Sequence, residues 1–217
     1  MHAQVVLFDG FDPLDVLGPL EVLYAGGIAT DGGITVELVS AEGARDVPSG
    51  LELVTLRATA RLDPERAGLI LVPGAAGSTE QRDPEDDSIP SRLARTQRTA
   101  LPALLADAMA QPGLTLASVC GGSLVLALSG LLKGRHATGH HDALEVLWGL
   151  GVSVVRARVV DDGDVVSGAG VTSGVDLGLH LLEREFGPRV AHTVEEMFAH
   201  ERRGVVWSAT GMEPTPI

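Results

Sequence analysis

Residues 114–132, LTLASVCGGSLVLALSGLL, join a short apolar strand to an apolar helix. We expect a buried strand over residues 114–119 and a helix over residues 123–132. The single cysteine of the chain, Cys120, lies at the junction and is followed by two glycines. Because glycine tolerates backbone conformations that other residues avoid, the chain can turn sharply there. The stretch therefore predicts a strand-to-helix elbow that carries a thiol.

The same order of strand and helix recurs on both sides of this elbow. Further strands are expected at residues 4–8, 34–40, 51–59, 69–72, 134–137, 152–160 and 165–166. Further helices are expected at residues 13–24, 91–109, 142–150, 173–185 and 189–203. Pro102 should break the second of these helices, and Thr172 or Ser173 should cap the fourth, with Asp176 at the capping-box position of Ser173.

Repeated alternation of this kind predicts an α/β fold with a mainly parallel sheet and helices on both faces. Two segments depart from the pattern. The strand at 51–59 follows its predecessor too closely for a helical crossover and should be an antiparallel excursion. The turn sequence DDGD at 161–164 predicts a small antiparallel β-ribbon.

Composition limits the classes of protein to consider. The chain has 217 residues without a recognisable linker, so we expect one domain spanning residues 1–217. Its net charge of −13 repels a phosphate backbone and an anionic membrane surface, which argues against nucleic acid and membrane as partners. We also expect a cytoplasmic protein, because no stretch approaches the ~20 apolar residues of a membrane span and the start does not resemble a signal peptide.

Cys120 is the first candidate for chemistry. A thiol at the start of a helix meets the positive end of the helix dipole, so we expect its pKa to fall below that of an ordinary cysteine. The N–H of Gly121 could then hold a developing anion. The alternative is that the thiol only fills the core, since free cysteine is among the most buried residue types.

Two further segments at strand ends could surround this thiol. The loop 73–77, PGAAG, offers the N–H groups of Gly74 and Ala75 for an oxyanion site, although such a loop is also an ordinary strand-ending turn. Asp15 follows the first strand, where it could transfer protons or merely cap the next helix.

Two histidines follow the segment 134–137. His140 could transfer protons near neutral pH, or it could be a hydrogen-bonded loop histidine. For His141 we favour the loop role. Paired histidines without other ligands do not indicate a metal, and we expect neither a metal nor a cofactor.

Taken together, these motifs resemble the ThiJ/PfpI superfamily, whose members carry an elbow cysteine on a domain like that of class I glutamine amidotransferases. The resemblance covers nearly the whole chain and implies a flavodoxin-like three-layer sandwich. It is carried by LDVLGPLE (14–21), VPGAAG (72–77), SVCGGSLVL (118–126), GLLKGRHATGH (130–140) and GAGVTSGVDL (168–177).

Within the superfamily, the motifs LDxxGP and VCxGSL are similar to those of isonitrile hydratase and of the amidase-like domains of certain transcription regulators. Those regulators also contact DNA, against which the acidic balance of this chain argues. The hydratase branch implies that Cys120 is the nucleophile and Asp15 the general acid/base, with amides of Gly74, Ala75 and Gly121 around the substrate.

The chain also departs from the branch. Gly121 stands where the hydratase motif carries threonine, and Thr138-Gly139-His140 stands where Thr-Thr-His is usual. Glyoxalase and protease-like branches generally use a glutamate from the first strand-helix region, which makes Glu21 a secondary candidate. We prefer Asp15 because its motif matches directly and Glu21 lies nearly two helical turns farther on.

These inferences converge on a cysteine-dependent hydratase that adds water to an isonitrile and yields an N-substituted formamide. The expected partner is a small electrophile, and the resemblance implies a homodimer. One alternative is a glyoxalase-like or deglycase-like enzyme that acts on reactive aldehydes. Another is a module that senses oxidants or binds ligands through Cys120 without turnover.

Overall fold

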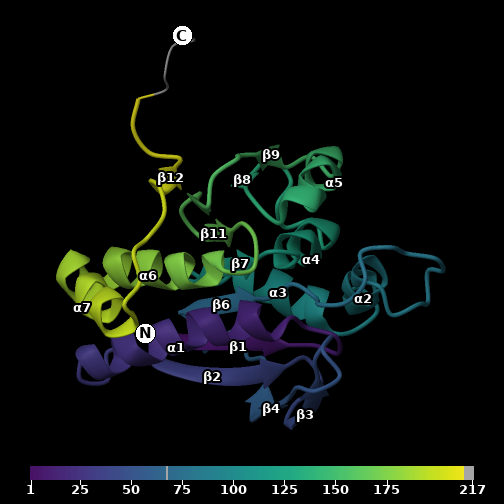
Figure 1. Cartoon of the computed structure of the whole chain (residues 1–217), viewed down its shortest axis with the longest axis horizontal. Coiled ribbons are helices and arrows are strands. Elements are labelled where there is room, and N and C mark those ends of the chain that lie inside the picture. The colour runs from purple at the N-terminus through teal and green to yellow at the C-terminus, as the bar shows by residue number, and fades with distance from the viewer. Residues whose placement is uncertain (67, 213–217) are drawn as a thin grey trace.

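The computed structural model describes residues 1–66 and 68–212 and has the three-layer arrangement that the alternation predicts (Figure 1). Within these residues the main sheet has eight strands in the order β12-β10-β11-β7-β6-β1-β2-β5. Its strands are β1 His2–Leu7, β2 Thr35–Ser40, β5 Ala60–Arg61, β6 Leu69–Val72, β7 Thr115–Val119, β10 Val159–Asp161, β11 Val165–Gly168 and β12 Trp207–Ser208. Two-stranded sheets are formed by β3 Arg45–Pro48 with β4 Thr55–Ala58, and by β8 His136–Ala137 with β9 Ser153–Val154.

The centre of the main sheet is parallel. Strands β5, β2, β1, β6, β7 and β11 run in one direction, whereas β10 returns antiparallel beside β11. This confirms both the flavodoxin-like fold and the β-ribbon that was expected around the DDGD turn. The carboxyl ends of β1, β6, β7 and β11 meet at one edge, which is where ligands bind in open α/β sheets.

Helices cover both faces of the sheet (Figure 1). On one face α1 Pro13–Ala29, α6 Ser173–Phe186 and α7 Pro188–Phe198 pack against one another, and α2 Ile89–Thr96, α3 Leu101–Met109 and α4 Gly122–Leu128 lie on the other. A short helix, α5 Leu144–Gly149, follows a 3₁₀ turn over His141–Ala143. Every residue of β6 and β7 is buried, as expected of parallel strands with helices on both sides.

Proline and aspartate define the helix starts near the site. Asp12 caps α1 by accepting a 2.9 Å hydrogen bond from the Leu14 N–H, and Pro13 follows in the first turn. The predicted break at Pro102 is confirmed, because α2 ends at Thr96 and a new helix starts at Leu101.

The capping box expected at Ser173 is wrong. Thr172 is the N-cap residue and no side chain bonds the helix end there, while the Ser173 hydroxyl is buried without a partner among the described residues. Asp176 instead pairs with Arg158 at 2.6 Å and accepts the Arg203 N–H at 3.1 Å. The Arg158 guanidinium and the Arg203 N–H thus take this carboxylate in place of the helix terminus.

Several element bounds differ from the prediction. The antiparallel pairing expected for this region exists, but it joins β3 to β4, and residues 49–54 form the turn between these two strands. The helix after the elbow ends at Leu128, because Gly130 takes a left-handed conformation with φ 77°. The last helix ends at Phe198, and the edge strand β12 beyond it was not predicted.

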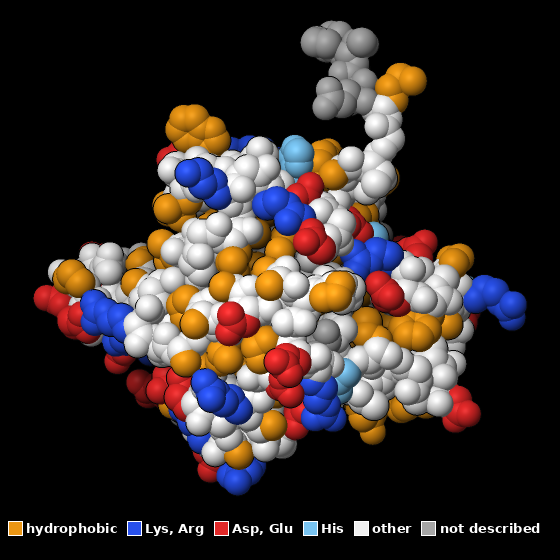
Figure 2. All heavy atoms as spheres, turned by 180° about the vertical axis from the view of Figure 1, so that it is seen from behind, with side chains coloured by type: hydrophobic (Ala, Val, Ile, Leu, Met, Phe, Trp, Pro, Cys, Tyr) orange, Lys and Arg blue, Asp and Glu red, His pale blue; other side chains and the backbone are white. Residues whose placement is uncertain are grey.

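Figure 2 shows the face opposite to that of Figure 1, where acidic and basic side chains are interspersed with apolar ones. The core consists mainly of buried valine, leucine and alanine. Among residues 1–66 and 68–212, no helix combines the length and the apolar character that crossing a membrane requires.

Candidate active site

Cys120 lies at the junction of β7 and α4, as predicted, in a conformation that few residues adopt. Its φ of 56° places it in the left-handed region, which residues with a Cβ avoid. Its N–H donates to the Gly168 carbonyl at 3.1 Å, and its carbonyl accepts the His140 N–H at 3.4 Å. Such strain persists only where the surroundings hold it, and here two neighbouring segments do so.

Asp15 lies in the first turn of α1 and is fully buried. Its Oδ2 accepts a 2.8 Å hydrogen bond from the Gly74 N–H, while no described group bonds Oδ1. The Cys120 thiol is close enough for each of the two groups to shift the pKa of the other. The structure thus brings the predicted nucleophile and the predicted acid/base together.

Backbone packing between two glycines makes this approach possible. A Cβ added at Gly74 would lie 2.6 Å from the Gly121 nitrogen and 2.8 Å from Asp15 Oδ2. Side-chain carbons do not come so close to other atoms, so any residue larger than glycine would push the loop after β6 away from the elbow. Gly74 therefore allows the loop that bonds Asp15 to pack directly against the elbow that carries Cys120.

The Asp15 carboxyl is an acid of unusually high pKa. Burial raises its pKa to about 8, and the nearby negative charge of Asp12 adds to this rise. Hydrogen bonds with the Gly74 N–H and with Cys120 oppose the rise without cancelling it. At neutral pH Asp15 is consequently protonated and can donate a proton.

The pKa expected for the thiol is wrong in direction. Burial and the Asp15 carboxylate raise the pKa of Cys120 well above its usual value, and the hydrogen bond from the Gly121 N–H only partly offsets them. Cys120 is 7% exposed, and α4 is a single short helix, so the loss of water outweighs the helix dipole. At neutral pH both the Asp15 carboxyl and the Cys120 thiol are therefore protonated.

The three amides expected around a substrate have different roles. The Gly74 N–H is already bonded to Asp15, so it does not face an empty oxyanion site. The Gly121 N–H is directed at the thiol. Ala75 forms an isolated antiparallel β-bridge with Phe11. The two hydrogen bonds of the bridge run from the Asp12 N–H to Gly74 O at 2.9 Å and from the Ala76 N–H to Gly10 O at 3.1 Å. Neither bond uses the Ala75 N–H.

Glu21 is not brought to the thiol. It is exposed on α1, whereas Asp15 is buried on the same helix. Six residues along a helix amount to 600°, which places the two side chains on different faces. Helix periodicity could have separated the two candidates from the sequence.

The two histidines lie on the segment that follows β8. His140 is half-buried, and its main chain contacts Cys120, but its ring faces Asp142, with Nδ1 3.5 Å from Oδ2. His141 is exposed and pairs with Asp142 at 3.2 Å. These three residues are the one group among the described ones whose ligand atoms, all within 4.8 Å of one another, could hold a metal. Two of the three are exposed, which makes this a weak candidate.

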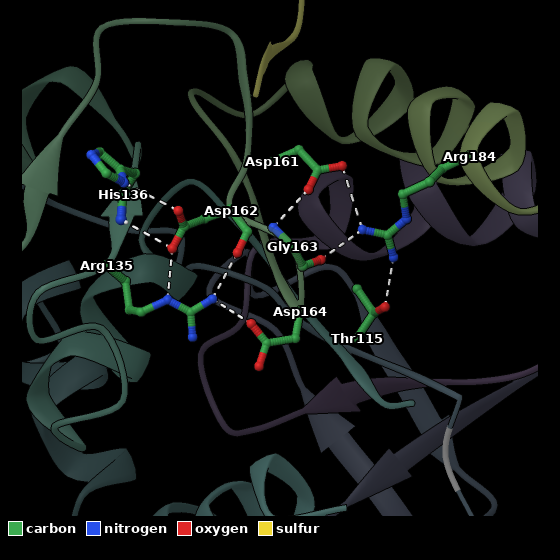
Figure 3. A network of polar contacts seen from close by, with 8 residues as sticks. All are labelled: Thr115, Arg135, His136, Asp161, Asp162, Gly163, Asp164 and Arg184. Atoms are coloured by element: carbon green, nitrogen blue, oxygen red, sulfur yellow. Dashed lines mark hydrogen bonds and ion pairs between the residues drawn. The ribbon is translucent and has the colours of Figure 1, made fainter. Parts of the chain in front are cut away.

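Figure 3 shows what anchors the chain at β8, just before that segment. Arg135 donates to the Asp162 carboxylate at 2.6 Å and to its carbonyl at 2.7 Å, and it also pairs with Asp164. Arg184 joins the same turn to β7 by bonding Gly163 O at 2.8 Å and Thr115 Oγ1 at 2.6 Å. Thr115 begins β7 and Cys120 follows its end, so this network lies at the opposite end of the strand from the thiol.

Sequence reasoning missed a set of buried hydroxyls beneath the elbow. The side chains of Ser118, Ser123 and Ser167 are fully buried. The hydroxyls of Ser118 and Ser123 are hydrogen-bonded to each other, and Ser123 Oγ also donates to the Thr138 carbonyl. The Thr138 N–H in turn donates to Ser167 Oγ. Serines inside otherwise apolar strands and an apolar helix were the available signal, because a buried hydroxyl needs a partner.

The model of the DJ-1/PfpI family matches residues 1–184, a range that includes Asp15, Gly74, Cys120 and His140. Isonitrile hydratase from Pseudomonas putida is 32% identical over 192 residues, which cover 88% of this chain and 74% of that protein.

Two further matches differ in extent. The HTH-type transcriptional regulator CdhR from Pseudomonas aeruginosa is 39% identical over 88 residues, 40% of this chain and 26% of the regulator. Among solved structures, a ThiJ/PfpI family protein from Pseudomonas syringae superposes with a TM-score of 0.75 at 26% identity, covering 94% of this chain and 76% of that one.

Proposed function

Because the chain belongs to the DJ-1/PfpI family, we propose that it is a cysteine-dependent enzyme that hydrates isonitriles to N-substituted formamides. The observation that carries the proposal is the buried pair of Cys120 and a protonated Asp15. The similarity to isonitrile hydratase over most of both chains supports the choice of reaction.

In the first step the pair adds a thiol across the terminal carbon of the isonitrile, R–NC. Asp15 donates its proton to that carbon while Cys120 Sγ forms a bond with it, and the thiol proton passes to Asp15. The product is a thioimidate, R–N=CH–S–Cys120. A carboxyl whose pKa of about 8 lies near neutral pH suits this exchange, because it both gives and regains a proton readily.

In the second step water resolves the thioimidate. The water oxygen bonds to the same carbon, and one of its protons reaches the nitrogen through Asp15. The C–S bond then breaks, the second proton returns to sulfur, and R–NH–CHO leaves. The sum is R–NC plus water, so the residues need supply only a nucleophile and a proton carrier.

One observation favours a second candidate function. At Gly121 the hydroxyl of the hydratase motif is missing, and Leu93 Cδ1 lies 3.0 Å from where a Cβ would be. The site beside the thiol is therefore less polar than the motif implies. A glyoxalase-like reaction, in which Cys120 adds to an aldehyde carbonyl, uses the same two residues.

The test compares the protein with its Cys120→Ser variant. Both are treated with EDTA and incubated with cyclohexyl isocyanide or with methylglyoxal, and formamide and lactate are quantified by NMR. Formamide that depends on Cys120 supports the hydratase, and lactate without formamide supports the glyoxalase-like enzyme. If a folded, alkylatable protein yields neither, a sensing or ligand-binding module becomes the better proposal.

We also propose a cytoplasmic homodimer that uses the edge of the site as its interface. Leu14, Leu51 and Leu53 are exposed beside the contact in which the Gly50 N–H donates to Phe11 O at 2.8 Å. A stable dimer would bury such apolar side chains. Light scattering of the purified protein tests the dimer, and Leu53→Asp should yield monomers.

A further inference from the structure

We propose that Ser123 is a positioning residue of the elbow, whose hydroxyl fixes the place of Cys120 relative to Asp15. Ser123 lies in the first turn of α4 and is fully buried. Its Oγ donates to the Thr138 carbonyl at 2.6 Å and lies 2.9 Å from Ser118 Oγ. The inference rests on the proposed function only in taking Cys120 as the reacting group.

The hydroxyl acts on a segment that has no strand partner at this point. Thr138 follows the last residue of β8, and its N–H donates to Ser167 Oγ at 2.9 Å. Ser118 and Ser167 are paired in register on β7 and β11. Side-chain hydroxyls from the sheet and from α4 thus take both polar groups of the Thr138 main chain, as a neighbouring strand would otherwise do.

The next two residues carry this constraint to Cys120. A Cβ added at Gly139 would lie 3.1 Å from the Cys120 carbonyl oxygen and 3.4 Å from Ser123 Cβ, so the chain passes closely between them. The His140 N–H then donates to that same carbonyl. The carbonyl belongs to the residue with φ 56°, so its partner determines where the strained residue is held.

Removing the Ser123 hydroxyl should therefore alter the thiol itself and not only the stability of the fold. Ser123→Ala leaves the Thr138 carbonyl buried without its donor, which favours movement of residues 138–140. The Cys120 carbonyl then loses its fixed hydrogen bond from the His140 N–H, and the distance between Cys120 and Asp15 is no longer fixed. The measurable consequence is that the influence of Asp15 on the reactivity of Cys120 becomes smaller.

The experiment measures alkylation of Cys120 by iodoacetamide in a double-mutant cycle at about pH 10, where Asp15 with its pKa of about 8 is ionised. In the parent protein, Asp15→Asn should speed alkylation by about tenfold or more, since one pKa unit changes the thiolate fraction about tenfold. In the Ser123→Ala background the same substitution should change the rate by less than about threefold. Circular dichroism and melting temperature establish that each variant is folded.

Ser40→Ala is the matched control. Ser40 is also fully buried, and its Oγ donates to the Gly43 carbonyl at 2.7 Å, but it lies at the end of β2. In this background the full effect of Asp15→Asn should remain. If it also remains in Ser123→Ala, Ser123 has only a structural role and the proposal is wrong.

A second variant covers the possibility of an unfolded Ser123→Ala protein. Ser167→Ala removes the hydroxyl that accepts the Thr138 N–H, so the same main-chain segment loses its other hydrogen bond. This variant should reduce the effect of Asp15→Asn in the same way. An undiminished effect in that background also overturns the proposal. Because no isonitrile is used, a failure of the hydratase assignment leaves this result interpretable.

Discussion

The Gly74 N–H donates a 2.8 Å hydrogen bond to Oδ2 of Asp15 and so ties the loop after β6 to the first turn of α1. The bond occupies one carboxyl oxygen and leaves Oδ1 without a partner among the described residues. Under the proposed function, Oδ1 is the carboxyl oxygen that can exchange a proton with the substrate.

Gly74→Ala should abolish activity and lower stability. The new Cβ would lie 2.6 Å from the Gly121 nitrogen, and such overpacking costs about 1 to 3 kcal/mol. Chemical denaturation and turnover measure the two effects. Gly149→Ala is the control, since nothing lies within 4 Å of its added Cβ and the helix should tolerate it. Equal behaviour of the two variants would contradict the packing argument.

Asp15→Asn should fold normally and lower turnover by about 10²-fold or more, because a positioned acid/base is lost. Glu21→Gln should leave the rate nearly unchanged, since Glu21 is exposed on another face of α1. Steady-state kinetics of both variants at equal melting temperature provide the check. The opposite ranking would transfer the acid/base role to Glu21.

Turnover should decline as the pH rises through about 8, the pKa of Asp15, because the first step needs its protonated form. The initial rate is measured between pH 6 and 9 with a substrate that does not titrate in this range. A rate that climbs throughout would instead indicate that thiolate formation alone limits the reaction.

Asp15 should also make stability depend on pH. Its pKa is raised in the folded state, so between roughly pH 4 and 8 the folded protein binds more protons than the unfolded chain, and stability falls as the pH rises. Asp15→Asn lacks this proton. Its melting temperature relative to the parent should therefore be higher at pH 8 than at pH 5. A difference that does not vary with pH would mean that Asp15 titrates normally.

Alkylation of Cys120 should be slow at pH 7 and rise only in alkaline solution, since burial and Asp15 raise the pKa of the thiol. Asp15→Asn should shift the profile to lower pH by removing the neighbouring charge. Mass spectrometry identifies the modified residue. A profile with a midpoint below that of a free cysteine would restore the expectation from the helix dipole.

Local sequence was enough to predict the elbow and its surroundings. Apolar periodicity changes from strand to helix at Cys120, and glycines follow it, so the thiol had to lie at a carboxyl strand end. The alternation of elements implied a parallel sheet, which brings the ends of β1, β6 and β7 to one edge. Asp15, Gly74 and Cys120 were predicted together for that reason.

Other features of the site depend on packing that no local pattern encodes. The pKa of Cys120 is raised because helices on both sides and the Asp15 carboxyl exclude water and add negative charge, which outweighs a dipole that the sequence did reveal. Gly74 donates to Asp15 instead of facing a substrate because two segments separated by 59 positions meet there. The contacts of Ser123 with Thr138, and of His140 with Cys120, likewise join distant segments. Local patterns thus specify which groups reach this edge of the sheet, whereas the protonation and the hydrogen-bond partners of these groups depend on burial and on contacts between remote residues.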